Sequence, residues 1–180
     1  MKREIEVPKI LHEIHGEKTT LLNFILTYLV GISIGLIVIL SLRNNELPIW
    51  KIILVFIVYI DVAGGVISNL SSSTNQYYQK RKILNLLFPI LHVIQPLIML
   101  FVFPKDYKYL IFIAVYTISF SYILKLLRKA EDQQSIASVA VIFGTVISLL
   151  IPVQIQVIYS FGLLFMIKIV LGFSVRRPVL

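Results

Sequence analysis

Residues 48–70, with the sequence PIWKIILVFIVYIDVAGGVISNL, decide the fold class of this chain. The stretch contains only two charged side chains, Lys51 and Asp61, and it is long enough to cross a bilayer, which needs about 20 mostly apolar residues. It lacks the alternation of apolar and polar residues that is typical of a membrane β-barrel strand. Inside lipid a helix satisfies its own backbone groups, so the stretch predicts a transmembrane helix.

Five further runs have the length of a membrane span, one of them more polar than the rest: 20–42, 84–103, 109–127, 136–151 and 154–174. At about 20 residues per span, roughly 120 of the 180 residues lie in the membrane, which leaves no room for a soluble domain. We therefore expect an all-α, polytopic transmembrane bundle of six spans. We expect the chain to consist of an N-terminal segment (1–19), a single six-helix membrane domain (20–174) and a short tail (175–180).

The composition excludes several classes of protein. Hydrophobic residues make up 58% of the chain and charged residues 14%, whereas a soluble domain is about half apolar and about a quarter charged. These values exclude a soluble enzyme, a disordered chain and a coiled coil. The chain has no cysteine, which excludes disulfides, thiol catalysis and every thiolate metal site.

The basic residues predict the orientation of the bundle. The N-terminal segment, the connectors 71–83 and 125–135 and the tail hold 12 of the 17 Lys and Arg residues. Positively charged loops stay in the cytoplasm, so both termini are expected there, in a protein integral to the plasma membrane. This topology explains the net charge of +8, and the chain has no nucleic-acid-binding motif. The expected partner is the lipid bilayer.

Asp61 is the first candidate functional residue, because it is the only acid inside a predicted span. It begins a helix face with Gly64, Gly65, Ser68 and Asn69, at spacings of three and four residues. The small residues of this face are typical of close helix packing. A carboxylate inside the membrane is costly unless it is paired, protonated or hydrated, so Asp61 is a functional hypothesis by default.

The following span has a matching polar face that contains His92, Gln95 and Pro96. Pro96 has no N–H for the carbonyl of His92, so we expect a kink there and an exposed acceptor. Counted from the connector ends of their spans, Asp61 and His92 both lie roughly 12 to 14 Å deep. We predict that they form a catalytic or binding pair. The alternative is that His92 donates to a backbone carbonyl.

A metal site is a further hypothesis. His12 and His15 lie on the side of the membrane where Asp61 and His92 are expected, and these four residues would supply nitrogen and oxygen ligands to a divalent cation such as zinc. The string His12-Glu13-Ile14-His15 is one residue short of the H-E-x-x-H signature, so that motif is not assigned. The alternative is that both N-terminal histidines are solvated.

The connector between the two polar faces predicts a ligand site. Its hydroxyls, amides and cations are suited to a lipid phosphate in the inner leaflet, although basic loops also serve only to fix topology. The candidate ligand-binding residues, in the connector and beside it, are Ser68, Asn69, Thr74, Asn75, Tyr78, Arg81 and Gln95.

Three other features are expected to be structural. Thr27, Gly31 and Gly35 recur every four residues and predict a packing seam, within the protein or in a homo-oligomer. Lys168, near the inner end of the last span, is expected to extend to the headgroups. The segment 9–19 predicts a short helix on the inner surface, weakened by Gly16.

Three classes of function remain open. The first is a polar pocket that faces the cytoplasm around Asp61 and His92, binds a lipid headgroup or small ligand and acts as a metal-dependent membrane hydrolase. The second is a small transporter or proton-coupled carrier, and the third is a structural or assembly partner without chemistry. Polar residues concentrate in one half of the membrane, which disfavours a continuous transport pathway.

Overall fold

The computed structural model describes residues 4–127 and 129–177, which are almost entirely helical. In chain order the elements are β1 (Glu4–Glu6), η1 (Lys9–Leu11), α1 (His12–His15), β2 (Lys18–Thr20), α2 (Leu21–Leu42), α3 (Ile49–Asn69), α4 (Ser72–Gln79), α5 (Lys82–Leu91), α6 (Ile94–Val102), η2 (Pro104–Asp106), α7 (Tyr107–Leu126), α8 (Ala130–Leu149), α9 (Val157–Met166) and η3 (Ile167–Phe173). Five helical stretches are long and apolar enough to cross a membrane: Leu21–Leu42, Ile49–Asn69, Lys82–Val102, Pro104–Leu126 and Glu131–Leu149. The predicted helical fold class is confirmed, and five of the six predicted spans form helices of sufficient length and apolarity.

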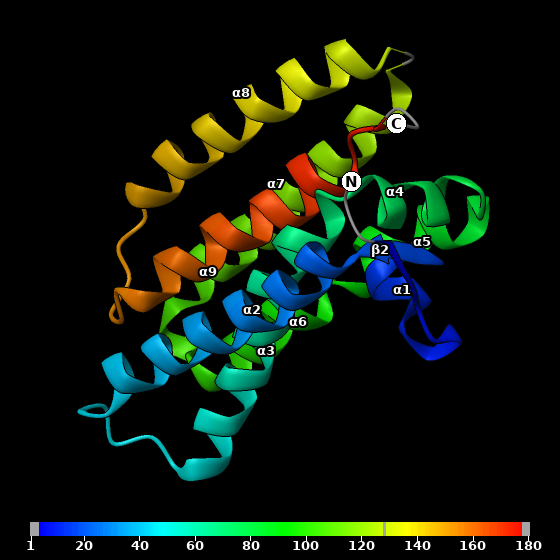
Figure 1. The fold of residues 1–180 in the computed structure, drawn as a ribbon. Coiled ribbons are helices and arrows are strands. Elements are labelled where there is room, and N and C mark those ends of the chain that lie inside the picture. Colours follow the sequence, from blue (N-terminus) through cyan, green and yellow to red (C-terminus); the bar gives the residue numbers. More distant parts are fainter. Residues whose placement is uncertain (1–3, 128, 178–180) are drawn as a thin grey trace.

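The last predicted span forms a shorter apolar helix, built from the ten residues of α9 and the seven of the π-helical η3. Although it is short, it is central: it contacts α3, α7 and α8 and lies between them in the bundle (Figure 1). Phe161, Phe165 and Lys168 of this helix are among the largest fully buried side chains. The hydrophobic core is therefore organised around α9 and η3.

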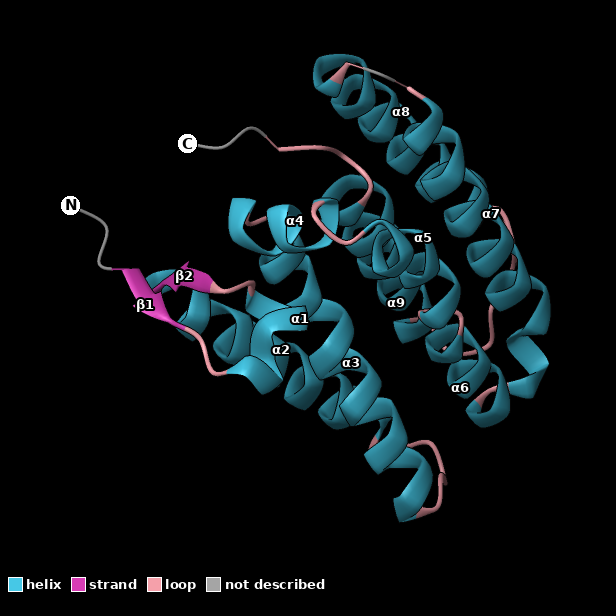
Figure 2. Ribbon diagram, turned by 90° about the vertical axis from the view of Figure 1, so that its right-hand side faces the viewer, coloured by secondary structure: helices cyan, strands magenta, loops and turns pink. Residues whose placement is uncertain are grey.

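Helices α2 and α3 form the most extensive helix pair and stand together beside the other helices (Figure 2). A Cβ atom added to Gly31 would lie 2.7 Å from the carbonyl oxygen of Ile60, and one added to Gly64 would lie 2.7 Å from that of Thr27. Small residues are therefore needed on both helices. The predicted seam of Thr27, Gly31 and Gly35 packs inside the protein, against α3.

The third apolar stretch is interrupted, as its prolines predict. α5 ends at Leu91 and α6 begins at Ile94, so the break falls at His92, four residues before Pro96. The backbone N–H of Gln95 donates to the carbonyl of His92 at 3.1 Å. The expected kink is present, but the carbonyl that Pro96 leaves unpaired is not an exposed acceptor, because Gln95 occupies it.

The N-terminal segment is not the single surface helix that its sequence predicts. η1 and α1 form one short helical turn each. The strands that precede and follow them, β1 and β2, pair antiparallel, with Ile5 opposite Thr19. Gly16 makes the turn between α1 and β2 with a φ of 73°, a conformation in which glycine is favoured. A side chain there would also collide with Ser73 of α4. The segment is therefore a compact cap on α4.

Candidate functional site

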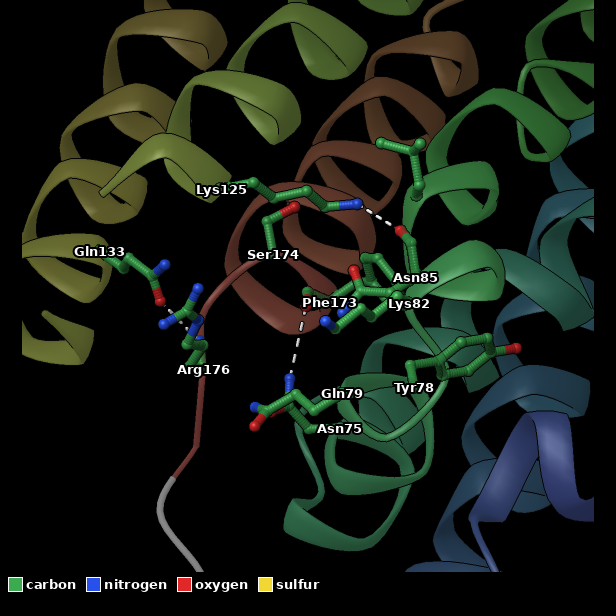
Figure 3. Close-up of a pocket in the computed structure, with 11 residues that line it drawn as sticks. Asn75, Tyr78, Gln79, Lys82, Asn85, Lys125, Gln133, Phe173, Ser174 and Arg176 are labelled. Carbon is green, nitrogen blue, oxygen red and sulfur yellow. Dashed lines mark hydrogen bonds between the residues drawn. The ribbon is translucent and has the colours of Figure 1, made fainter. Parts of the chain in front are cut away.

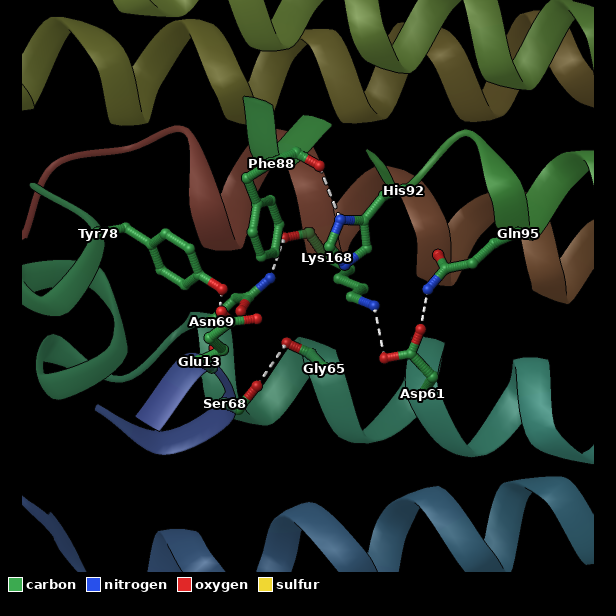
Figure 4. A network of polar contacts seen from close by, with 10 residues as sticks. All are labelled: Glu13, Asp61, Gly65, Ser68, Asn69, Tyr78, Phe88, His92, Gln95 and Lys168. Atoms are coloured by element: carbon green, nitrogen blue, oxygen red, sulfur yellow. Dashed lines mark hydrogen bonds and ion pairs between the residues drawn. The ribbon is translucent and has the colours of Figure 1, made fainter. Parts of the chain in front are cut away.

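Asp61 lies at the centre of a polar cluster that three elements build (Figure 4). Its Oδ1 accepts from Lys168 Nζ of η3 at 2.9 Å, and its Oδ2 accepts from the side-chain amide of Gln95 of α6. Asn69, the last residue of α3, lies eight positions after Asp61. At about 1.5 Å per residue, the ion pair of Asp61 and Lys168 is therefore about 12 Å from that end of the helix, inside the membrane-spanning stretch. The intramembrane acid is therefore paired with a cation.

The two members of this ion pair have different surroundings. The Lys168 side chain is 2% exposed, whereas the Asp61 side chain is 54% exposed. Gly65 makes room for the lysine, because a Cβ atom at this position would overlap Lys168 Cε. Lys168 also lies in a π-helical stretch, and such stretches are frequent at functional sites. The lysine is therefore locked in place, and part of the carboxylate remains accessible.

His92 belongs to the same region but does not form the predicted direct pair with Asp61. Its Nδ1 donates to the carbonyl of Phe88 at 2.7 Å, and its ring stacks on the Phe88 ring with centroids 3.9 Å apart. His92 therefore follows the alternative given by the sequence, in which it donates to a backbone carbonyl. His92 follows the break after Leu91, and its ring is held against its own helix by Phe88. Lys168, and not His92, is the direct partner of Asp61. Figure 4 shows His92 beside Lys168.

Gln95 completes the cluster and leaves one group unsatisfied. Its amide nitrogen donates to Asp61, while its Oε1 is buried and has no hydrogen-bond partner among the residues that the structure describes. A buried acceptor without a donor costs about 1 to 3 kcal/mol. Beside the partly exposed Asp61 carboxylate there is therefore a buried acceptor oxygen whose need for a donor is not met by the described residues.

The other predicted ligand-binding residues mostly hold the protein together. Thr74 Oγ1 donates to the carbonyl of Ile14 at 2.8 Å, and Tyr78 Oη donates to that of Glu13 at 3.0 Å. These two bonds attach α1 to α4. Burial raises the pKa of Tyr78, so its hydroxyl remains a donor. Thr74 and Tyr78 therefore use their hydroxyl protons to hold the N-terminal cap.

Asn75 and Asn69 attach the C-terminal part of the chain in the same way. Asn75 Nδ2 donates to the carbonyl of Val175 at 2.8 Å, and its Oδ1 accepts the backbone N–H of Arg177 at 2.9 Å. Asn69 Nδ2 donates to the carbonyl of Lys168 at 3.3 Å. The connector thus joins both ends of the protein, which explains its high content of amides and hydroxyls.

Two more predicted residues also have internal partners. Ser68 Oγ donates to the carbonyl of Gly65 in its own helix. Arg81 forms an ion pair with Glu17 at 3.2 Å and lies over the Tyr77 ring. Of the seven predicted ligand-binding residues, only Gln95 shares the cluster with Asp61.

The predicted metal site is not assembled. Within residues 4–127 and 129–177, no group of three or more His, Asp or Glu side chains is placed to hold a metal ion. His12 Nε2 bonds to the carbonyl of Val7 at 2.8 Å, and His15 Nε2 bonds to the Tyr28 hydroxyl at 3.2 Å. Both histidines therefore bond to groups outside the Asp61 cluster. His15 is also buried, not solvated, and its burial lowers its pKa.

Lys168 is the functional residue that the sequence interpretation missed. It was assigned to the headgroup region, but it turns inward and pairs with Asp61. The signal was present in the sequence, because Lys168 lies farther from a span end than the other basic residues of the predicted spans and Asp61 is the only acid in them. Intramembrane charges generally pair with one another.

Comparisons with protein families, curated proteins and solved structures found nothing similar to this chain, so its function has to be inferred from this site.

Proposed function

We propose that this protein is an integral membrane protein that binds a hydroxyl or amino group of a membrane-soluble molecule, a lipid headgroup or a small ligand, at Asp61 and Gln95. One observation carries the proposal: among the residues that the structure describes, the buried Gln95 Oε1 has no donor, and it belongs to the side chain that bonds to the half-exposed Asp61 carboxylate. Lys168 already balances the charge of Asp61, so the ligand needs a donor and not a net charge. Figure 4 places the His92 ring beside Lys168, in the same cluster.

The access route that we propose is lateral, from the lipid. Large apolar side chains are exposed on the helices that carry Asp61, His92 and Gln95, including Ile57 of α3, Leu91 of α5 and Ile94 of α6. These surfaces suit acyl chains, and the Asp61 carboxylate on α3 is itself half-exposed. A molecule with an apolar body and one polar donor matches this arrangement.

The topology is part of the proposal. We place six spans in the plasma membrane, with both termini in the cytoplasm. Two features support this choice: an even number of spans brings both ends to one face, and Asn75 and Thr74 tie the C-terminal tail and the N-terminal cap to the same helix, α4. The basic connectors lie at that end of the bundle.

The one-sided position of the polar cluster favours binding over transport. Beyond Asp61, in the direction of the N-terminal end of α3, the core is filled by aromatic side chains such as Tyr59, Tyr109 and Phe161. Tyr59 donates to the carbonyl of Val157 at 2.7 Å, which anchors this packing. A carrier needs polar access from both faces. Metal-dependent hydrolysis is not proposed, because its ligands are not brought together.

The test compares lipids that differ only in the donor. Native mass spectrometry of the detergent-solubilised protein would be titrated with phosphatidylethanolamine and phosphatidylcholine of identical acyl chains, and with diacylglycerol and its O-acetyl ester. We expect donor-bearing lipids to bind about tenfold more tightly, as one buried hydrogen bond predicts.

Gln95→Leu should remove this preference, and Gln156→Leu, which changes an exposed glutamine at the other end of the bundle, should leave it intact. Equal affinities for donor and acetylated or methylated lipids in the wild-type protein would contradict the proposal.

A further inference from the structure

A second cavity, separate from the Asp61 cluster, lies at the end of the bundle where α4, α5, α7 and the chain after η3 meet (Figure 3). Its volume is about 380 Å³. Three cationic side chains line it, Lys82, Lys125 and Arg176, and they come from segments that are far apart in sequence. No Asp or Glu is among its lining residues. The fold therefore gathers three positive charges around one cavity without a lining acid.

Amide side chains also line the cavity, and their hydrogen bonds to the protein fix its shape. Asn75 and Gln79 come from α4, and Gln133 comes from the first turns of α8. Gln133 is buried; its Nε2 donates to the carbonyl of Leu124 at 3.0 Å, and its Oε1 accepts the backbone N–H of Arg176 at 2.9 Å. This bond fixes the tail segment that carries Arg176 at the cavity. The site is thus held by the fold and is not a chance gathering of surface lysines.

The cations of the cavity have unused donor capacity. Lys125 Nζ gives one hydrogen bond to the carbonyl of Asn85 and lies 5.1 Å from the centre of the Phe173 ring. In the part of the chain that the structure describes, neither Lys82 nor Arg176 forms an ion pair. α5 also begins at Lys82 without a side-chain cap, which leaves N–H groups of its first turn unpaired beside the cavity. Like charges held together in this way repel one another unless an anion joins them.

We propose that this cavity binds a phosphate group, which Lys82, Lys125 and Arg176 surround. Phosphate is chosen because it offers several acceptor oxygens to donors that converge from different directions. The cavity lies at the end of the spanning helices, where lipid headgroups are found. Leu86 lines it and is exposed, so an acyl chain can leave the cavity along α5. The phosphate belongs either to an anionic lipid or to a soluble phosphate, and the site is independent of the donor ligand proposed at Asp61.

The experiment measures both sources on the full-length protein in mild detergent. In the first arm, native mass spectrometry follows titration with phosphatidylglycerol and with phosphatidylcholine of the same acyl chains. In the second arm, thermal unfolding is measured in sodium phosphate and in sodium chloride of equal ionic strength. Binding of phosphatidylglycerol in preference to phosphatidylcholine assigns the site to a lipid. A rise of Tm in phosphate alone assigns it to a soluble phosphate.

The variants separate this cavity from general charge effects. Lys82→Gln/Arg176→Gln should weaken binding by about tenfold or more, because each basic residue near a membrane surface contributes about 1 kcal/mol, which is about fivefold in affinity. Both side chains are exposed, so the fold should tolerate the change. Lys9→Gln/Lys80→Gln removes the same charge from exposed positions outside the cavity and should leave affinity within about twofold. The proposal is overturned if neither phosphate source binds, or if the two double variants weaken binding equally.

Discussion

The ion pair between Asp61 and Lys168 should behave as a coupled unit when either partner is removed. Truncation of Asp61 to Ala leaves a lysine that is 2% exposed without its counter-charge. Loss of one partner of a buried pair costs about 3 to 5 kcal/mol, and because the Asp61 side chain is 54% exposed we expect the lower end of this range, about 3 kcal/mol. Lys168→Met leaves only the half-exposed carboxylate and should cost about 2 kcal/mol.

The double variant Asp61→Ala/Lys168→Met should be less destabilised than the sum of its parts. Neither charge remains, and Met fills a volume similar to that of Lys, so the main loss is the amide of Gln95, which no longer has Asp61 as its acceptor. This loss is worth about 1 to 3 kcal/mol. A double-mutant cycle should then give a coupling energy of about 3 kcal/mol.

The assay is unfolding by sodium dodecyl sulfate in mixed micelles, followed by the fluorescence of Trp50. This residue is the only tryptophan, and its ring packs against Phe101 at 5.6 Å between centroids, so its emission reports the contact of α3 with α6. The control cycle uses Glu6→Ala and Lys18→Met, an exposed pair at 3.9 Å that should couple by less than about 1 kcal/mol. A coupling energy below about 0.5 kcal/mol for Asp61 and Lys168 would refute the reasoning.

Four further predictions test individual contacts. A lipid-soluble carbodiimide should activate Asp61 and join it to Lys168 as an amide, detected by mass spectrometry as one cross-linked peptide with the loss of one water; a mono-labelled Asp61 without the cross-link would contradict the pairing. Gly65→Ala should destabilise the protein by about 1 to 3 kcal/mol because it displaces the buried lysine, and a neutral effect in the same unfolding assay would disprove the close approach. Burial lowers the pKa of His15, so the unfolded cap binds protons more readily, and the stability of the cap should fall as pH decreases below about 6.5; the protection factors of residues 4–20 against hydrogen exchange should therefore fall in acid, and His15→Phe should abolish this dependence. Asn75→Ala removes the hydrogen bond to the carbonyl of Val175, so we expect faster proteolytic cleavage of the chain on the C-terminal side of this residue; an unchanged cleavage rate would refute the anchoring role of Asn75.

The spans were predictable because their signal is local. A run of apolar residues such as 48–70 must form a helix in lipid whatever surrounds it, and the structure places α3 within it at Ile49–Asn69. The seam of Thr27, Gly31 and Gly35 was equally visible, although the sequence did not show that α3 would fill it. The interruption at His92 follows from Pro96, which acts on its own helix.

The site was predictable only in part. Asp61 and Gln95 were identified from their spans, but Lys168 is 107 residues from Asp61 and was assigned to the headgroups. The direction in which a lysine points depends on the space beside it, and here that space exists because Gly65 has no side chain. The amides and hydroxyls of the connector indicated a ligand site, but two of them, Thr74 and Asn75, bind the protein's own backbone.

The sequence by itself determined that the chain is a bundle of apolar helices with one acid inside a span, because hydrophobic length and the cost of a charge in lipid act on each segment separately. Only the tertiary structure decided which partner neutralises that acid and which groups stay unsatisfied. Those outcomes depend on how α3, α6 and η3 pack, since the contacts that bring Lys168 and Gln95 to Asp61 join residues far apart in the chain.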